Sequence, residues 1–541
     1  MSLRPAVKID GRIVTGRASD NHDSLIASNH LHDVPESARG FTDGRIFLTR
    51  RQAVNWLRVH QPEILKRIAP KLDDTGLYSH IYAAAIGVRQ VEPEKQKPAG
   101  APDVSRMKAI VYDYGYHTYV ADRIAREYGE VFYYKPDWKA FFPTRDKQKV
   151  GHGFDSYERI LSFWDYKDKA DVIIFPGLYD ADLQESLRKQ GHLVYGSGRS
   201  ECTEIDKWLF AHILMSGTGE EDEELLKSYG LEGITVNLPI IPTTKIVGLD
   251  NLRAYLKGKE DLYITPRFTR DRGDMETEHF EDEEKFKTVL RAISYDCEYE
   301  EEDKEFIVRP KVESPCESGY DEYQIDGQSS PYLTCGNEYK DESYICRVMR
   351  LEDLPEPLDK VRRAMAQVYK RLGYRGNHST EVRFDEEGTG LFIDDSCRIG
   401  QPPGEIWSEL WEEYGANMYQ VAEGNLPDMK PVAKWAAMVN VHSPWLGSGN
   451  WCPVSYPKEV AQWVKLRNNT IIGGREYCLP FDKEATLGAV IGLGNTQDEA
   501  IEKCLENLEE FWAHKMFAKE ESFEKAKEAM RAGKRFGLNI G

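Results

Sequence analysis

Hydrophobic and polar positions follow different periods along the chain, and the changes between them mark its segments. Near the start, AVKIDGRIVTGR alternates around Asp10 and Gly11, which predicts a β-hairpin. FTDGRIFLTRRQAVNWLRVH then predicts a short strand and a helix, with Thr49 as the N-cap. Residues 91–106 are rich in Pro, Lys and Glu and poor in apolar side chains, which is typical of a linker. We therefore expect a separate N-terminal module over residues 1–90.

Apolar runs alternate with helical periods from residue 107 to about residue 200. MKAIVYDYG, EVFYY, ADVIIFPGLYD and HLVYGSG predict four strands that are buried on both faces. Helices are predicted at HTYVADRIAREYG, which should end at Gly129, at DADLQESLRKQG and at SECTEIDKWLFAHILMSGTG. This alternation predicts a doubly wound α/β sheet. Because the dinucleotide fingerprint GxGxxG does not follow the first strand, NAD binding is disfavoured.

The rest of the chain mixes strands and helices without strict alternation. LYITPRF, EFIVRPKV, YDEYQIDG, STEVRF and GLFIDDS predict strands of an α+β region over residues 201–430. Residues 431–541 contain an apolar strand, a Gly-rich turn and a helix that Thr496 should cap, with Glu499 three residues on. The predicted order is a module, a linker, an α/β domain, a large α+β domain and a C-terminal α+β domain.

Composition narrows the class of protein without naming its chemistry. A chain of 541 residues, 40% apolar and 30% charged, is long enough for several folded domains and too apolar for general disorder. The net charge of -20 argues against a nucleic-acid surface that spans the whole protein. The nine cysteines form no CxxC pair and no zinc pattern, so reduced thiols are expected. The sequence has no apolar run of about 20 residues and begins without a signal peptide, so we expect no membrane association and a cytoplasmic location.

Candidate chemistry concentrates in STEVRFDEEGTGLFIDDSCR, residues 379–398. Two strands joined by a turn would set Glu381 opposite Asp394, and alternation would put Asp394, Ser396 and Arg398 on one face. Two facing carboxylates repel unless a cation lies between them, which would suit Mg²⁺. Arg398 would suit a phosphate or a carboxylate. The alternative is an exposed edge hairpin with solvated acids, and the spacing alone leaves both interpretations open.

The order of these residues resembles a known family. An acid followed on the next strand by acid-x-Asn-x-Arg is similar to the magnesium site of the ATP-grasp superfamily, with Ser396 where the family usually has Asn. The resemblance covers residues 107–541. Residues 107–198 resemble the pre-ATP-grasp domain, and VIGLGNTQDEAIEK resembles the C-terminal domain of phosphoribosylamine–glycine ligase. It implies Glu381, Asp394 and Ser396 as metal ligands.

The same resemblance implies where ATP would bind. EIDKWLFAHIL is similar to the segment with the family's first ATP-binding lysine, which would be Lys207. ESPCESGYDEYQIDG resembles the hinge over the adenine. The implied nucleotide contacts there are the backbone of Lys311, Val312 and Glu313 and the ribose-binding carboxylate of Glu317.

One departure from the family concerns its second lysine, which normally ends a strand before a glycine-rich flap. Thr265 stands at that position, and Arg267, Arg270 and Arg272 follow it. We expect these arginines to meet the ATP phosphates, with backbone N–H groups around Gly273. Together with Arg398, Arg267 and Arg272 are then the expected catalytic cations. The alternative is a degenerate site that no longer hydrolyses ATP.

The resemblance implies a ligase that uses ATP and Mg²⁺ to activate a small-molecule carboxylate as an acylphosphate, which an amine or similar nucleophile then attacks. Such chemistry requires positioning and charge neutralisation rather than a protein nucleophile, and no GxSxG signature occurs. The rival hypothesis is a nucleotide-binding switch or scaffold without catalysis. A homodimer is the default expectation. The N-terminal module resembles a small domain of phage-encoded proteins and is a candidate for recruiting a partner or carrier.

Overall fold

The computed structural model describes residues 3–9, 12–15, 39–42, 47–68, 100–136, 149–215, 220–268, 277–282, 287, 302–314, 316–481 and 485–540. The chain divides into two compact units, Met1–Lys97 and Pro98–Gly541. Each unit has its own hydrophobic core, and each is described by itself. In the described part of the chain, no helix combines the length and the apolar character that crossing a membrane requires.

In its described residues, the first unit is a four-stranded antiparallel sheet followed by two helices. Its strands are β1 (Arg4–Ile9), β2 (Arg12–Thr15), β3 (Arg39–Thr42) and β4 (Phe47–Thr49), in the order β2-β1-β3-β4. The helices are α2 (Arg50–His60) and α3 (Pro62–Ile68). The predicted pairing of β1 with β2 is confirmed, and so is the Thr49 cap, whose side chain accepts the Gln52 N–H.

The second unit begins with a parallel sheet, as the sequence predicts, and this sheet has five strands rather than the predicted four. The strands are β5 (Lys108–Tyr112), β6 (Glu130–Tyr134), β7 (Glu158–Ile160), β8 (Val172–Ile174) and β9 (Val194–Tyr195), in the order β7-β6-β5-β8-β9. All four pairings are parallel. Strand β7 is not predicted by the sequence, because it is a three-residue edge strand with two charged side chains.

Two predicted helices differ from their expected form. The first, α5 (Thr118–Ile124), ends before Gly129, because the N–H groups of Arg126 and Glu127 turn back to carbonyls three residues earlier. It is also buried on nearly every side, since later helices pack against its outer face. The helix predicted over residues 200–219 is interrupted at Asp206, which is extended and forms a β-bridge with Phe268.

The small antiparallel sheet of the second unit has the order β10-β13-β11-β12. Its strands are β10 (Thr244–Val247), β11 (Leu262–Pro266), β12 (Glu278–Phe280) and β13 (Glu305–Pro310). One face packs with α10 (Leu249–Leu256) around a separate core that contains Ile246, Leu252, Ile264 and Phe306. The other face carries Thr265, Arg309 and other polar side chains.

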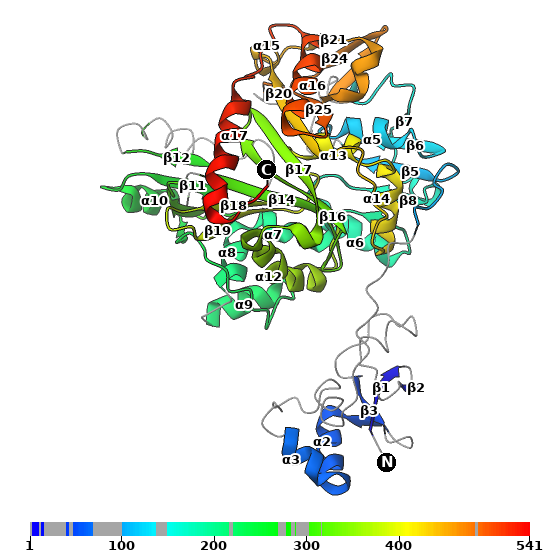
Figure 1. The fold of residues 1–541 in the computed structure, drawn as a ribbon, viewed down its shortest axis with the longest axis vertical. Helices are drawn as coiled ribbons and strands as arrows, with labels where there is room; N and C mark the ends of the chain where they lie inside the picture. The colour runs from blue at the N-terminus through cyan, green and yellow to red at the C-terminus, as the bar shows by residue number, and fades with distance from the viewer. Residues whose placement is uncertain are drawn as a thin grey trace. The chain divides into compact units, whose positions relative to one another are not determined.

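The large sheet is antiparallel and follows the order β19-β18-β14-β16-β17-β20-β25-β22, with β15 paired to β14. Its strands are β14 (Cys316–Ile325), β15 (Gln328–Ser329), β16 (Tyr332–Tyr339), β17 (Ser343–Arg350), β18 (Arg375–Phe384), β19 (Gly390–Ser396), β20 (Trp435–His442), β22 (Val464–Leu466) and β25 (Thr486–Gly494). Because β17 pairs with β20, the segment after residue 430 continues the same sheet, and the colour changes from green to orange across it (Figure 1).

Helices cover both faces of this large sheet. One core lies under α8 (Lys207–Met215), α12 (Glu356–Leu372), α16 (Gln497–Glu509) and α17 (Ser522–Gly533). The opposite core lies under α13 (Gly404–Leu410) and α14 (Tyr414–Glu423), which also pack against the parallel-sheet domain. The predicted Thr496 cap of α16 is confirmed, because its side chain accepts the Glu499 N–H.

Shorter elements complete the second unit. A further sheet has the order β23-β24-β21-β26. The remaining elements are α6 (Ala181–Lys189), α7 (Cys202–Ile205), α9 (Glu220–Ser228), α15 (Pro444–Gly447), β21 (Cys452–Ser455), β23 (Asn469–Ile472), β24 (Arg475–Cys478), β26 (Trp512–Ala513), and the 3₁₀ turns η4 (Lys167–Lys169), η5 (Gly198–Glu201), η6 (Leu351–Asp353), η7 (Lys458–Trp463) and η8 (Lys534–Phe536).

Candidate active site

The β18–β19 hairpin sets two carboxylates side by side at the edge of the large sheet. Glu381 pairs directly with Asp394 in the strand register, as the sequence predicts. A register shift follows, since Val382 pairs with Phe392 and leaves Ile393 as an extra residue. Beyond this bulge Asp394 and Ser396 are half-buried, whereas Asp395 is buried. We call the side with Glu381 and Asp394 the front face of the hairpin.

Asp394 is held by the first residue of helix α8. The Lys207 Nζ donates to Asp394 Oδ1 at 2.8 Å. Burial by itself would raise the pKa of Asp394, but the Lys207 ammonium outweighs it and the pKa falls to about 2. Asp394 therefore stays ionised at every physiological pH. Asp394, the expected metal ligand, and Lys207, the expected nucleotide ligand, are thus in direct contact.

Glu381 is the more weakly paired of the two carboxyl groups. Its nearest cation is Lys340, whose Nζ lies 3.5 Å from Glu381 Oε1, and the Lys340 side chain is 70% exposed. Burial raises the pKa of Glu381 to about 8, and the nearby carboxylates of Glu317 and Asp394 add to this, against the opposing effect of Lys340. At neutral pH the front face therefore holds one ionised carboxyl group, on Asp394, and one protonated carboxyl group, on Glu381.

Ser396 is the last residue of β19, and Arg398 extends the front face past the end of this strand. The Arg398 Nε donates to Glu204 Oε1 at 2.8 Å, and Glu204 Oε2 accepts the Cys397 N–H at 2.8 Å. Burial raises the pKa of Glu204, although Arg398 opposes it. Sequence reasoning missed Glu204, whose only signal is its position one helical turn before Lys207. Glu204 thus anchors Arg398 to α7, close to Lys207.

Of the residues that are predicted to meet the ATP phosphates around the flap, some lie within the described part of the chain and others lie outside it. Thr265 lies on β11, where its hydroxyl has one weak contact, to the carbonyl of Pro266 at 3.4 Å. Arg267 binds Asp206 and Glu305 rather than the front-face carboxylates. Arg270, Arg272 and Gly273 lie outside the described residues. Their nucleotide roles therefore stay predictions, and Arg267 is already engaged by protein carboxylates.

The predicted adenine hinge joins the small sheet to the large sheet. Lys311, Val312 and Glu313 directly follow β13, and the Lys311 Nζ lies 2.7 Å from Glu313 Oε1. Glu317 lies on β14 opposite Arg383, whose Nε donates to Glu317 Oε2 at 2.9 Å. The structure thus brings Glu317 to the strand beside Glu381, while the roles of these residues toward a nucleotide stay predictions.

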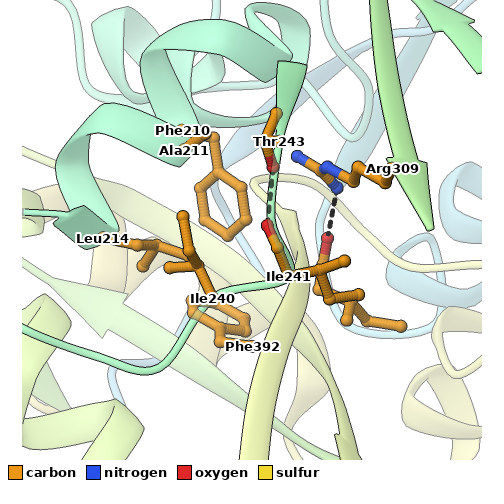
Figure 2. Close-up of a pocket in the computed structure, with 9 residues that line it drawn as sticks. Phe210, Ala211, Leu214, Ile240, Ile241, Thr243, Arg309 and Phe392 are labelled. Atoms are coloured by element: carbon orange, nitrogen blue, oxygen red, sulfur yellow. Dashed lines mark hydrogen bonds between the residues drawn. The ribbon is translucent and has the colours of Figure 1, made fainter. Parts of the chain in front are cut away.

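A small apolar pocket lies behind the hairpin, beside Asp394. It is lined by Phe210, Ala211, Leu214, Ile240, Ile241, Thr243, Arg309, Phe392 and Ile393. Figure 2 shows Arg309 at the polar side of the pocket, where its Nη1 donates to the Ile393 carbonyl at 3.5 Å. Burial lowers the pKa of Arg309, with Asp394 opposing. Sequence reasoning missed this residue, although an arginine within the apolar strand EFIVRP was a usable signal.

On the opposite side of the hairpin, which we call the back face, a second group of charged side chains is fully buried. The His378 Nε2 lies 2.7 Å from Asp395 Oδ1, and its Nδ1 lies 3.4 Å from Glu322 Oε1. Tyr369 also donates to Asp395 at 2.7 Å. Burial would lower the pKa of His378, but hydrogen bonds to both carboxylates raise it to about 9. All three charged side chains are fully buried, so this network belongs to the core.

Comparison with solved structures identifies the fold. No family model matches the sequence, and no curated protein matches it. Phosphoribosylamine–glycine ligase from Thermotoga maritima is similar with a TM-score of 0.55 at 12% identity, over 76% of this chain and 98% of that one. A biotin carboxylase–β-γ-ATP complex from Campylobacter jejuni is similar with a TM-score of 0.52 at 14% identity, over 81% of this chain and 99% of that one.

A third structure extends the comparison. The biotin carboxylase domain of 2-oxoglutarate carboxylase from Hydrogenobacter thermophilus, solved with MgADP and bicarbonate, is similar with a TM-score of 0.50 at 12% identity, over 80% and 99%. At such low identity these similarities show the fold alone. The predicted ATP-grasp fold is therefore confirmed: a parallel-sheet domain is followed by antiparallel sheets in the expected order.

Proposed function

We propose that this protein is an ATP-dependent ligase that activates a small carboxylate and joins it to an amine. The observation that carries the proposal is the front face of the β18–β19 hairpin, within an ATP-grasp fold. There Glu381 and Asp394 face each other beside Lys207 and Arg398, and Glu381 is paired only with the exposed Lys340. Such a cluster suits a ligand that brings both a cation and phosphate groups.

The front-face carboxylates fit a magnesium ion. Among the residues that the structure describes, no group of three or more His, Cys, Asp and Glu side chains is assembled for a metal. Mg²⁺ does not require one, because it keeps several waters and is usually held by one or two carboxylates together with substrate phosphates. Glu381 and Asp394, with the Ser396 hydroxyl beside them, would hold it. The ion would neutralise phosphate charge and displace the proton of Glu381.

Lys207 and Arg398 are the cations that would bind the phosphate groups and the substrate carboxylate. Lys207 is placed to exchange Asp394 for a phosphate oxygen, and a charge-assisted contact of this kind contributes roughly 1.5–3 kcal/mol. Arg398 presents a planar donor fork beside the same carboxylates and would orient the substrate carboxylate. Residues 311–313 and Glu317 line the join between the small and large sheets, where the proposed adenosine would lie.

The reaction would run in two balanced steps. A substrate carboxylate oxygen attacks the γ-phosphorus of ATP, ADP leaves, and an acylphosphate forms. The amine then attacks the acyl carbon, inorganic phosphate leaves, and the nitrogen loses a proton. Both steps need alignment and charge neutralisation, which Lys207 and Arg398 would provide, and neither needs a covalent bond to the protein.

One observation favours a second candidate, a nucleotide-binding switch or scaffold without catalysis. Thr265 supplies no charge at the family's second lysine position, and the guanidinium of Arg267 is occupied by Asp206 and Glu305. A clamp with one cation fewer would still bind a nucleotide and would stabilise the transferring phosphoryl group less.

The experiment that separates the candidates combines calorimetry with product detection. The purified protein is titrated with ATP and Mg²⁺, then incubated with pools of carboxylates and amines, and ADP and ligated products are measured by mass spectrometry. Substrate-dependent ADP together with a condensed product supports the ligase. Tight ATP binding with no ADP from any pool favours the scaffold. Failure to bind ATP in the presence of Mg²⁺ contradicts both.

A further inference from the structure

The interruption between α7 and α8 is organised around one carboxylate. Asp206 is 1% exposed, and its Oδ1 accepts the N–H groups of Trp208 at 3.1 Å and Leu209 at 3.0 Å, which caps helix α8. The Tyr229 hydroxyl donates to Asp206 Oδ2 at 3.0 Å. A buried cap with these contacts defines where α8 begins, and the first residue of α8 is Lys207.

Arg267 completes this arrangement from the end of strand β11. Its Nε and Nη2 donate to the two oxygens of Asp206 at 2.9 and 2.8 Å, and its Nη1 donates to Glu305 Oε2 at 2.6 Å. Burial would lower the pKa of Arg267, and these hydrogen bonds raise it above its ordinary value. Bidentate pairing of this kind is geometrically specific, so the guanidinium is committed to one orientation.

The backbone connects the same two elements. The Lys207 N–H donates to the Arg267 carbonyl at 2.9 Å, and Asp206 forms a β-bridge with Phe268. From this fixed backbone position the Lys207 side chain reaches Asp394 on β19. The small sheet, the start of α8 and the front face of the hairpin are therefore linked through one short path.

We propose that the Asp206–Arg267 pair is a positioning unit that holds Lys207 against Asp394, and that Arg267 acts on the site only through this pair. Its catalytic consequence rests on the proposed ligase function, whereas its effect on Lys207 does not. A lysine side chain has many rotamers, so it delivers its charge to one place only if its backbone is fixed. Arg267 is then a positioning residue rather than a phosphate ligand.

The first test measures Lys207 directly in the protein without ligand. Asp206→Asn keeps the size of the side chain and removes its charge. Arg267→Lys keeps the positive charge and removes the planar fork, so each variant breaks the bidentate pair. We expect acylation of Lys207 by an amine-reactive reagent, followed by peptide mass spectrometry, to become about tenfold faster in both variants. Lys503 on α16 serves as the internal reference. Arg253→Lys on α10, where Arg253 pairs with the exposed Asp250, is the matched control and should change nothing.

Unchanged Lys207 labelling in both pair variants, each shown to be folded by urea unfolding, overturns the proposal. If Asp206→Asn does not fold, Arg267→Lys alone decides, because it leaves the helix cap in place. This readout needs no nucleotide, so it stands even if the protein does not bind ATP and the proposed function fails.

The second test asks whether the pair acts through Lys207. ATP affinity is measured for Lys207→Ala, for Arg267→Lys, for Asp206→Asn and for each pair variant combined with Lys207→Ala. We expect each pair variant to weaken ATP binding about tenfold, and to add nothing once Lys207 is removed. Fully additive losses, or a loss in Arg267→Lys with none in Asp206→Asn, would mean that Arg267 meets the phosphates itself and that the inference is wrong.

Discussion

The two faces of the β18–β19 hairpin carry similar residues with opposite electrostatic outcomes. On the back face, His378 lies between Glu322 and Asp395, all three are fully buried, and the pKa of the histidine rises to about 9. On the front face, Glu381 and Asp394 are partly exposed, and burial together with nearby acids raises the pKa of Glu381 to about 8.

This difference teaches how a structural charge network is distinguished from a binding site in the same hairpin. The back face supplies its own cation, since the His378 Nε2 lies 2.7 Å from Asp395 Oδ1 and all three charged side chains are fully buried. On the front face the cations are Lys207 and Lys340, which come from distant parts of the sequence, and Glu381 is still protonated at neutral pH. A carboxyl group that its surroundings force away from its ordinary charge state is typical of a functional site.

The largest expected effect separates the two faces by activity. Asp394→Asn is nearly isosteric and should keep the fold, but it removes a carboxylate from the proposed metal site. We expect Mg²⁺-dependent ATP turnover to fall by about 100-fold or more. Asp395→Asn, on the other face, should retain most of the turnover. Steady-state ADP release under saturating ATP measures both, and normal turnover by Asp394→Asn would refute the site assignment.

The next effect separates the faces by stability. His378→Gln removes the cation between Glu322 and Asp395 and leaves two buried carboxylates without a partner charge. We expect the free energy of unfolding at pH 6 to fall by about 3–5 kcal/mol. Lys207→Ala breaks the partly exposed Lys207–Asp394 pair and should lower the free energy of unfolding by only about 1 kcal/mol. Urea unfolding provides both values, and equal losses would show that the front face is also a structural network.

The pH dependence of stability should separate them further. His378 has a folded pKa of about 9 against an ordinary value of 6.5, so its stabilisation is complete below pH 6.5 and is lost as the pH rises through 9. Glu381 acts with the same sign between 4.5 and about 8. The free energy of unfolding of the wild type minus that of His378→Gln should therefore fall between pH 6.5 and 9, by up to about 3 kcal/mol.

The free energy of unfolding of the wild type minus that of Glu381→Gln should instead fall between pH 4.5 and about 8. If the two difference curves fall in the same pH window, then the two faces are electrostatically coupled, and the comparison between them does not hold.

The smallest expected effect is a gain in stability. At pH 9 Glu381 is ionised opposite Asp394, and Glu381→Gln replaces it with a neutral side chain of the same shape. We expect the free energy of unfolding at pH 9 to rise by about 0.5–1 kcal/mol, while Mg²⁺-dependent ATP binding is lost. Thermal unfolding with and without Mg²⁺ and ATP tests both parts. A destabilised Glu381→Gln protein would argue that the carboxylate serves the fold.

Periodicity alone was sufficient for several parts of this protein. Alternation in the stretch around FIDDS predicted the hairpin, the pairing of Glu381 with Asp394 and the face on which Asp394 lies. Continuous apolar runs likewise predicted the parallel sheet, and the Thr49 and Thr496 caps follow from local hydrogen bonds. In each of these cases the forces act between residues that are close in sequence or that repeat with a short period, so the pattern carries the information.

Long-range contacts decided the remainder. Nothing near Arg267 in the sequence indicates that Asp206 occupies its guanidinium, and nothing near His378 indicates Glu322. The break in the helix at Asp206 is equally hidden, since the segment has a continuous helical pattern and the competing β-bridge comes from Phe268. Charge pairs and bridges between distant segments depend on how the sheets pack, and packing is a property of the whole chain rather than of any window within it.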